Sequence, residues 1–442
     1  MGRIETSQNF VVICCNKTVL VYDRRNGDSR TLSLNIPETP EESKKATDSD
    51  ETTAQDMLFC SKNQVVCARI SQDEKYVAVA CEPKTVTVWC TQSWSLQHTH
   101  NLVKRPVSVD ISSDSKVILV ADKTGDVYHF PLKGGELEET SVCDDRQEMS
   151  PESDSQGNGV QKNDVPALLG HLSMLLDVAI SLDSRFIITC DRDEKIRVSH
   201  YPNSYNIQSF CLGHREFVTQ INLLPNHGNL LLSCSGDGTL RLWEYEIGQC
   251  VAVMDTREHS SPILHHFTKY SEERIKQSAE ATRYLPDYPP LRCFALHPCA
   301  EDEYLVATML DKIPSVLLYK IKDRKLHYLS TTSLEGLPLA LAWLDSKTLL
   351  VQEESEEQPL SVYQCEEDKL SRLKEHTLIS LGMNFKQFFS EGGPGGVNMD
   401  ILYKQRYDNV AEYLKKKEER IALTKAVEAG LVPAPPKKGR WE

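Results

Sequence analysis

Two stretches of this chain are variations on one sequence. Residues 170–199 read GHLSMLLDVAISLDSRFIITCDRDEKIRVS, and residues 213–243 read GHREFVTQINLLPNHGNLLLSCSGDGTLRLW. Each opens with Gly-His, and each ends on an apolar strand that follows a tight turn containing aspartate. Self-similarity at a period of about 40–45 residues with these end residues is typical of the blades of a WD-repeat β-propeller. A chain of this kind is expected to hold partners rather than to catalyse a reaction.

The repeated polar residues predict a hydrogen-bonded chain inside each blade. In the second unit, Asp237 can accept from His214 and from turn amides. Ser233 can bridge to the indole of Trp243, which only donates. The matching residues of the first unit are His171, Thr189 and Asp193, with Ser199 in place of the tryptophan. We therefore expect both histidines to be structural rather than catalytic or metal-binding.

Strand ends of the same type recur along the whole chain. Strands of apolar-x-apolar-aromatic form end at Tyr22, Trp89, Phe130, Trp243, Tyr319, Tyr363 and Tyr403, with Ser199 as the odd member. Eight such ends against a usual seven blades predict that a strand in 400–406 closes the ring beside the N-terminal hairpin at 10–22. The predicted fold is all-β: a seven-bladed WD-repeat β-propeller with acidic loop insertions and a C-terminal helix.

Three steps between strand ends are longer than one blade because they contain inserted residues. Residues 37–56 and 131–165 are acidic and poor in apolar side chains, so they cannot bury a face and should be mobile loops. The third insert is expected to include a short helix around 271–281. We predict a propeller over residues 1–406, with flexible acidic inserts at about 30–56 and 131–165, and a C-terminal helix and basic tail over residues 407–442.

Composition is that of an intracellular protein. The 14 cysteines include no C-x-x-C pair or metal-type spacing, so buried thiols in a reducing compartment are the simplest interpretation. The sequence contains no apolar run long enough to span a membrane and no signal peptide at its N-terminus. A formal net charge of −14 argues against a general nucleic-acid coat.

The C-terminal region is basic and has helical spacing. Residues 408–429 are expected to form a helix with Asp408 as its N-cap. Its cations could reach RNA phosphates, or they could be solvated on a helix whose apolar residues pack elsewhere. The candidate RNA contacts are Lys415, Lys416, Lys417 and Arg420.

Catalytic motifs are missing from the sequence. The glycine cluster at 392–396 contains a proline and does not join a strand to a helix, so it is no nucleotide loop. We find no nucleophile elbow, zincin pair or carboxylate dyad. No cofactor is expected in this chain.

Several segments together resemble the non-catalytic WD-repeat subunit of eukaryotic tRNA (guanine-N7)-methyltransferase. They are GHLSMLLDVAISLDSRFI, ADKTGDVY, CDRDEKIRVS, SFCLGHREFV, SGDGTLRLWEY and YDNVAEYLKKKEER. The resemblance implies a heterodimer with a Rossmann-type catalytic subunit that binds S-adenosylmethionine and methylates N7 of guanine-46 in the variable loop of tRNA. This chain would stabilise and position that subunit, in the nucleus and away from membranes.

The resemblance also implies a docking site at residues 191–197. The standard turn of the other unit, Ser-Gly-Asp-Gly-Thr at 235–239, is replaced here by Asp-Arg-Asp-Glu-Lys at 191–195. Such charges do not help the turn, although an exposed arginine on a blade strand is itself ordinary. The candidate partner-binding residues are Asp191, Arg192, Glu194, Lys195 and Arg197.

A general interaction scaffold and a ubiquitin-ligase substrate receptor are the alternatives. Receptors of that type usually carry Trp-Asp-x-Arg at the end of a repeat. This chain has Trp-Glu-Tyr-Glu at 243–246 and Trp-Cys-Thr-Gln at 89–92, which lack both the aspartate and the arginine. A free-standing enzyme is the third and least favoured class.

Overall fold

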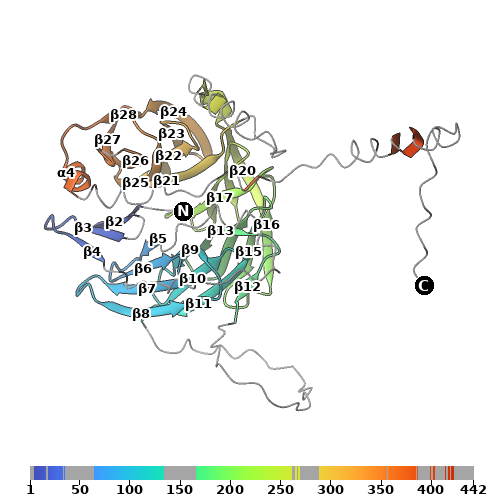
Figure 1. Ribbon diagram of the computed structural model, residues 1–442, viewed down its shortest axis with the longest axis horizontal. Helices are drawn as coiled ribbons and strands as arrows, with labels where there is room; N and C mark the ends of the chain where they lie inside the picture. The colour runs from blue at the N-terminus through green and yellow to red at the C-terminus, as the bar shows by residue number, and fades with distance from the viewer. Residues whose placement is uncertain are drawn as a thin grey trace, which may run out of the picture.

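The computed structural model describes residues 4–15, 18–32, 34, 64–133, 166–260, 288–355 and 357–384, with a few residues between 264 and 268 and between 386 and 422. Its strands form seven antiparallel four-stranded sheets around a central axis (Figure 1). The prediction of an all-β, seven-bladed propeller is therefore confirmed.

The first four blades follow one another along the chain. Blade 1 comprises β1 (Ile4–Thr6), β2 (Phe10–Cys15), β3 (Thr18–Asp23) and β4 (Ser29–Leu32). Blade 2 comprises β5 (Val65–Ile70), β6 (Tyr76–Cys81), β7 (Thr85–Cys90) and β8 (Leu96–Asn101). Blade 3 comprises β9 (Pro106–Ile111), β10 (Val117–Asp122), β11 (Asp126–Pro131) and β12 (Leu169–Gly170). Blade 4 comprises β13 (Leu175–Ile180), β14 (Phe186–Asp191), β15 (Ile196–His200) and β16 (Ile207–Cys211).

Three further blades complete the ring. Blade 5 comprises β17 (Val218–Leu223), β18 (Leu230–Ser235), β19 (Thr239–Glu244) and β20 (Gln249–Asp255), followed by α2 (Arg257–Ser260). Blade 6 comprises β21 (Leu291–Ala300), β22 (Glu303–Leu310), β23 (Ser315–Lys322) and β24 (Lys325–Ser333). Blade 7 comprises β25 (Pro338–Asp345), β26 (Thr348–Glu353), β27 (Leu360–Glu366) and β28 (Lys369–Arg372), followed by α4 (Thr377–Asn384).

The position of a strand within its blade explains its sequence. The second strands β2, β10, β14 and β18 are buried at every residue because neighbouring blades cover both faces, so each begins with at least three apolar residues. Outer strands such as β8 are exposed and polar. Seven of the eight predicted strand ends lie on the third strands of the seven blades, as expected: Tyr22, Trp89, Phe130, Ser199, Trp243, Tyr319 and Tyr363.

The ring closes differently from the sequence prediction. Each sheet is built from consecutive strands, and blade 1 is already complete within residues 4–32. Leu402 and Tyr403 lie in a turn and a bend, and they pack against blades 4 and 5 rather than beside the N-terminal hairpin. The prediction of a closing strand at 400–406 is therefore wrong, because the N-terminal segment supplies all four strands of its own blade.

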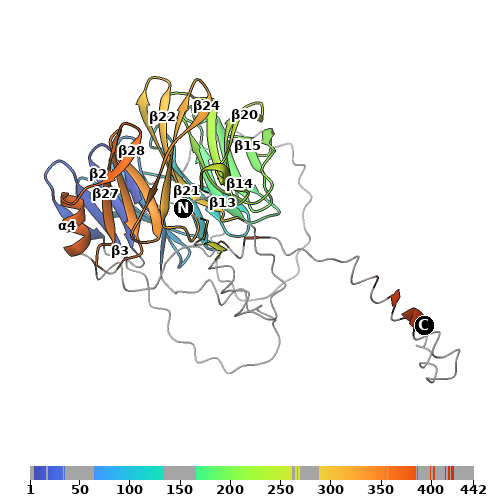
Figure 2. The same ribbon diagram turned by 90° about the horizontal axis from the view of Figure 1, so that it is seen from above.

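Helix α4 and side-chain packing join the first blade to the last. α4 lies beside β3 and β27 (Figures 1 and 2). Its Leu378, Ile379 and Leu381 share one buried cluster with residues of blades 1 and 7. The Thr6 hydroxyl donates to the carbonyl of Trp343 at 2.8 Å. Burial of apolar surface thus closes the ring where a shared strand was expected.

A belt of polar contacts around the axis begins at Arg69. On β5, Arg69 pairs with Glu5 of blade 1 and with Asp110 of blade 3, each at 3.2 Å. Burial raises the pKa of Glu5 and of Asp110, and the charge of Arg69 opposes this rise. Glu5 and Arg69 also line an axial cavity of about 230 Å³.

The belt continues from blade 3 to blade 7. Asp177 on β13 accepts from the Ser108 hydroxyl at 2.6 Å and from the Ile221 amide at 3.0 Å. Two further contacts are Phe294 N to Gln220 Oε1 at 2.9 Å and Trp343 Nε1 to Ala295 O at 3.1 Å. Together with the Thr6 contact, these bonds link all seven blades in sequence.

Several predicted features lie partly or wholly outside the described residues. β4 extends to Leu32, so the first insert begins later than the predicted residue 30. Residues 35–63, 134–165 and 269–287, which include most of the inserts and the predicted helix at 271–281, are not described, nor is the glycine cluster at 392–396.

Candidate functional site

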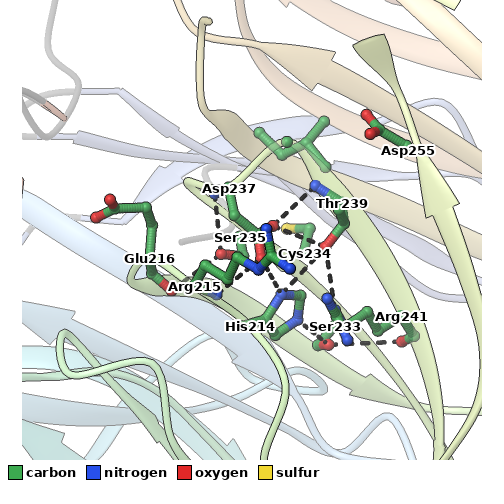
Figure 3. Close-up of polar contacts among 12 residues, drawn as sticks. His214, Arg215, Glu216, Ser233, Cys234, Ser235, Asp237, Thr239, Arg241 and Asp255 are labelled. Carbon is green, nitrogen blue, oxygen red and sulfur yellow. Dashed lines mark hydrogen bonds and ion pairs between the residues drawn. The ribbon is translucent and has the colours of Figure 1, made fainter. Parts of the chain in front are cut away.

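Blade 5 contains the complete hydrogen-bonded chain expected from its sequence, and Figure 3 shows its His214, Ser233 and Asp237. His214 lies 3.1 Å from Asp237 Oδ2 through Nδ1, and 2.7 Å from Ser233 Oγ through Nε2. Trp243 Nε1 donates to the same Ser233 oxygen at 2.8 Å. The indole must donate to Ser233, so the hydroxyl donates to His214, and the imidazole donates to Asp237.

The pKa shifts of His214 and Asp237 support the same donor and acceptor roles. Burial lowers the pKa of His214, against the opposing hydrogen bond with Asp237. Burial raises the pKa of Asp237, but the hydrogen bond and charge of His214 outweigh it, so the net shift is downward. A neutral imidazole beside a charged carboxylate is the result. All four groups satisfy one another inside the blade, which leaves His214 a structural residue.

Blade 4 assembles the equivalent chain with a different aspartate. His171 Nε2 lies 2.8 Å from Thr189 Oγ1, and His171 Nδ1 lies 3.3 Å from Asp191 Oδ2. The expectation that Asp193 is this acid is wrong. Asp191, the last residue of β14, accepts through Oδ1 from the amides of Asp193 and Lys195, so it closes the turn as well. Ser199 stands in the tryptophan position, and its Oγ has no hydrogen-bond partner among the described residues.

The charged turn at 191–195 divides into an inward and an outward part. Asp191 is only 2% exposed, so its predicted role in partner binding is wrong. Arg192 also turns inward: its Nε donates to the carbonyl of Leu402 at 2.9 Å and its Nη2 to that of Tyr403 at 3.3 Å. Glu194, with φ of 71°, is half-exposed, and Lys195 is exposed.

Arg197 is the most informative residue of the outward part. Its Nη1 donates to the Gly170 carbonyl at 3.0 Å, while its Nε is buried without a hydrogen-bond partner in the described part of the chain. Burial lowers the pKa of the Arg197 guanidinium, and the carboxylate of Asp191 opposes this shift. Arg197 is half-exposed, so the part of its guanidinium that reaches the surface can donate to a carboxylate of another molecule.

Exposed apolar side chains lie near Arg197 in the strand register or along the chain. These side chains were not identified from the sequence. Phe210 on β16 is directly opposite Arg197 in the strand register and is 41% exposed. Leu172, which follows the tetrad histidine, is fully exposed, and Leu212 is 62% exposed. The sequence signal for this surface was a large apolar residue next to the Gly-His pair of each repeat, Leu172 in the first and Leu212 in the second. We call Glu194, Lys195, Arg197, Phe210 and Leu172 the blade 4 surface.

The predicted C-terminal helix is described at Leu414, Lys417, Glu418 and 420–422, all of them helical and exposed. Lys417 and Arg420 are therefore both accessible. Leu414 and Ile421 are each 47% exposed, so in this chain alone they are not core residues. The candidate contacts Lys415 and Lys416 lie outside the described residues.

Metal-ligating side chains do not cluster in the described part of the chain. It holds no group of three or more His, Cys, Asp or Glu side chains able to bind a metal ion. None of its twelve described cysteines forms a disulfide, and burial raises the pKa of thiols such as Cys190 and Cys234. None of the described helices is long and apolar enough to cross a membrane.

A propeller with structural tetrads and a charged, apolar-rimmed blade surface is a WD-repeat interaction protein. Residues 24–164 and 143–377 match the family described as the tRNA methyltransferase TRM82 WD40 domain. The chain belongs to this family.

Named relatives agree with the family match. The human tRNA (guanine-N(7)-)-methyltransferase non-catalytic subunit WDR4 is 31% identical over 423 residues, covering 91% of this chain and 89% of the relative. The *Danio rerio* subunit of the same name is 29% identical, covering 96% and 93%. Among solved structures, the RRP9 WD40 repeats match with a TM-score of 0.51 at 16% identity, covering 80% of this chain and 87% of theirs, which shows the fold alone.

Proposed function

We propose that this chain is the non-catalytic subunit of a tRNA (guanine-N7)-methyltransferase and that it holds and positions a separate catalytic subunit. Family membership and the names of relatives at up to 96% coverage support this function. The observation that carries the docking site is the half-exposed Arg197, which lies opposite the exposed Phe210 on adjacent strands of blade 4.

The blade 4 surface has the composition of a docking site. Arginine and aromatic side chains dominate the binding energy of interfaces, especially where neighbours exclude water. Arg197 and Phe210 are paired across adjacent strands, with exposed Lys195 and Leu172 beside them. We infer that a carboxylate of the catalytic subunit pairs with the exposed part of the Arg197 guanidinium while apolar side chains cover Phe210 and Leu172.

The proposed function also includes the cofactor, assembly, location and target base that the family implies. The catalytic subunit supplies S-adenosylmethionine, the two chains form a heterodimer in the nucleus, and the methylated base is guanine-46 in the variable loop of tRNA. This chain contributes rigid shape and charge. Sequencing methylated tRNA from cells with and without this chain tests the position of the base, and fluorescence imaging of a tagged chain tests the location.

A double charge reversal, Glu194→Lys with Arg197→Glu, tests the docking site. Removing one partner of a desolvated interfacial charge pair costs about 2–5 kcal/mol, so affinity for the catalytic subunit should fall about 30-fold or more. Titration calorimetry with the purified catalytic subunit measures this loss. The melting temperature of the variant should stay near that of the wild type.

Arg185→Glu provides a matched control. Arg185 is an arginine of the same blade, 59% exposed and paired with Asp183 in the turn between β13 and β14, at the opposite end of β14 from the charged turn. It should leave affinity unchanged. Wild-type affinity in the double variant would place the docking site elsewhere on the propeller.

A further inference from the structure

After the last blade, the chain returns to the opposite side of the ring. α4 packs with blades 1 and 7, whereas Met399, Leu402 and Tyr403 belong to a buried cluster formed with blades 4 and 5. Met399 and Leu402 are each 1% exposed and Tyr403 is 6% exposed. These three residues, which we call the C-terminal anchor, are as buried as the core of a blade.

Tyr403 is held by Phe217, which precedes β17. Their rings meet edge to face, with centroids 4.9 Å apart and planes at 79°. The Phe217 ring in turn covers Gly236, where a Cβ atom would lie 2.6 Å from the ring. The small turn residue of blade 5 therefore makes room for Phe217, and Phe217 offers Tyr403 an aromatic face of favourable geometry.

Arg192 holds the main chain of the anchor. It donates from Nε to Leu402 O and from Nη2 to Tyr403 O, two consecutive carbonyls. Its own amide donates to Met174 O at 2.9 Å, as the amide of Gly236 does to Phe217 O in blade 5. The two turns are thus equivalent in backbone position, and arginine stands where the other blade has glycine. Only a planar guanidinium presents two such donors in a fixed geometry.

We propose that Arg192 is a positioning residue that fixes the C-terminal anchor to the junction of blades 4 and 5, so that the cationic C-terminal helix starts from the same side as the blade 4 surface. The attachment of the C-terminal anchor is supported by the contacts described above and does not depend on the proposed function. Its consequence for tRNA rests on the proposed function, because it takes the blade 4 surface as the place where the catalytic subunit binds.

The turn at 191–195 contributes both to the blade 4 surface and to the contacts of the C-terminal anchor. These two parts of the molecule therefore have a fixed relative position. Arg192 lies in sequence between Asp191, which closes the turn, and half-exposed Glu194 and exposed Lys195. A catalytic subunit bound at the blade 4 surface therefore lies next to the point where the chain leaves the anchor. Exposed Lys417 and Arg420 follow this point along the chain and can add charge beside the bound tRNA.

Hydrogen–deuterium exchange on the full chain tests the anchor without partner or RNA. The amide of Leu402 is bonded to Met399 O at 3.0 Å, so it reports whether the anchor is formed. Arg192→Ala should raise the exchange rate of amides in 399–403 at least tenfold and leave β13–β19 unchanged. Tyr403→Ala, which keeps Arg192, should release the same amides. Wild-type protection of 399–403 in both variants would overturn the anchor.

Arg215→Ala is the matched control, because Arg215 is an exposed arginine at the same end of the next blade. It should leave exchange in 399–403 unchanged, whereas equal release in this variant would overturn the specific role of Arg192. Arg192→Lys should restore only part of the protection, since an ammonium lacks the planar pair of donors.

A second experiment tests positioning in the complex with the catalytic subunit. Arg192→Ala should lower tRNA affinity by about as much as the double variant Lys417→Gln with Arg420→Gln, and combining the changes should add little. Full additivity, or unchanged affinity in Arg192→Ala, would overturn the positioning role. Failure of the docking site itself would show instead as wild-type partner affinity in the Glu194 and Arg197 double variant.

Discussion

His171 and Asp191 lie 3.3 Å apart in blade 4, with both side chains almost fully buried. This contact joins the loop before β13 to the end of β14, and the same carboxylate receives two turn amides. In blade 3, Asp122 occupies the equivalent strand end and accepts from the amides of Thr124 and Gly125. In each of these two successive blades, a carboxylate at the end of the second strand thus accepts from the amides of the turn that follows the strand.

The first prediction separates the two aspartates of the blade 4 turn. Asp191→Ala leaves a buried histidine and two amides without their acceptor, so it should lower the free energy of unfolding by about 1–3 kcal/mol. Asp193→Ala should cost clearly less, because Asp193 is half-exposed. Chemical denaturation of both variants measures the difference. Equal costs would contradict the assignment of Asp191 to the tetrad.

Much of the fold was predictable because strands in a propeller repeat the same environment. The third strand of every blade is largely buried and carries an aromatic residue or Ser199 near its end, so seven strand ends were found from sequence alone. β1 was missed because it has only three residues, Ile-Glu-Thr, which carry little pattern. Its omission made Tyr403, at the end of an apolar run, look like the missing strand.

The site was only partly predictable. Asp191 and Asp193 are two residues apart and both fit a turn, so only the geometry of His171 distinguishes them. The inward role of Arg192 had no signal, because its acceptors are main-chain carbonyls 210 and 211 positions away. The chain of His214, Ser233, Asp237 and Trp243 was found because every member is a side chain with a repeated position.

The second prediction concerns Arg69 in the axial belt. Arg69→Met leaves Glu5 and Asp110 without their cation, and it should cost about 1.5–3 kcal/mol near neutral pH. Burial already raises the pKa of both carboxyls in the folded chain. Losing Arg69 raises them further, so the folded variant binds protons more tightly than the unfolded chain and gains stability as the pH falls. Urea denaturation at pH 8 and pH 5 should show a smaller cost at pH 5.

Arg185→Met is the control for the axial belt. Arg185 forms an exposed pair with Asp183, whose pKa is lowered in the folded chain despite partial burial, chiefly by hydrogen bonds from Ser181 and Arg185. An exposed ion pair contributes only about 0–1 kcal/mol to the free energy of unfolding. Because the pKa of Asp183 is lowered rather than raised, the destabilisation caused by Arg185→Met should not become smaller at pH 5. A cost of Arg69→Met that is independent of pH would argue against buried carboxylates as its cause.

The third prediction is that this chain alone does not bind S-adenosylmethionine. Such cofactors are cradled where a strand leads through a glycine-rich turn into a helix. Helices α2 and α4 have four and eight residues, and they follow blades 5 and 7 rather than opening from such a turn. Calorimetry with the purified chain should show no heat of binding at micromolar cofactor, whereas the complex with its catalytic subunit should bind. Binding by the chain alone would contradict a non-catalytic role.

The fourth prediction concerns the cations of the C-terminal helix. Lys417 and Arg420 are exposed, and Lys415 and Lys416 adjoin them in sequence. Changing all four to glutamine should leave assembly with the catalytic subunit intact and weaken tRNA binding. Each lost phosphate contact should reduce the slope of log affinity against log salt by about 0.7–0.9. Titrating tRNA into the assembled complex at several salt concentrations measures this slope.

Leu414→Asp distinguishes an RNA contact from a packing helix. Leu414 and Ile421 are each 47% exposed in this chain, so a partner surface could cover them. If the helix serves chiefly to pack on the catalytic subunit, Leu414→Asp disrupts assembly, while the four-glutamine variant keeps the wild-type salt slope. If the cations contact phosphate, the slope becomes shallower in the glutamine variant at unchanged subunit affinity. One variant alters charged side chains and the other an apolar side chain of the same helix, so the pair of measurements assigns the role of the helix whichever outcome is found.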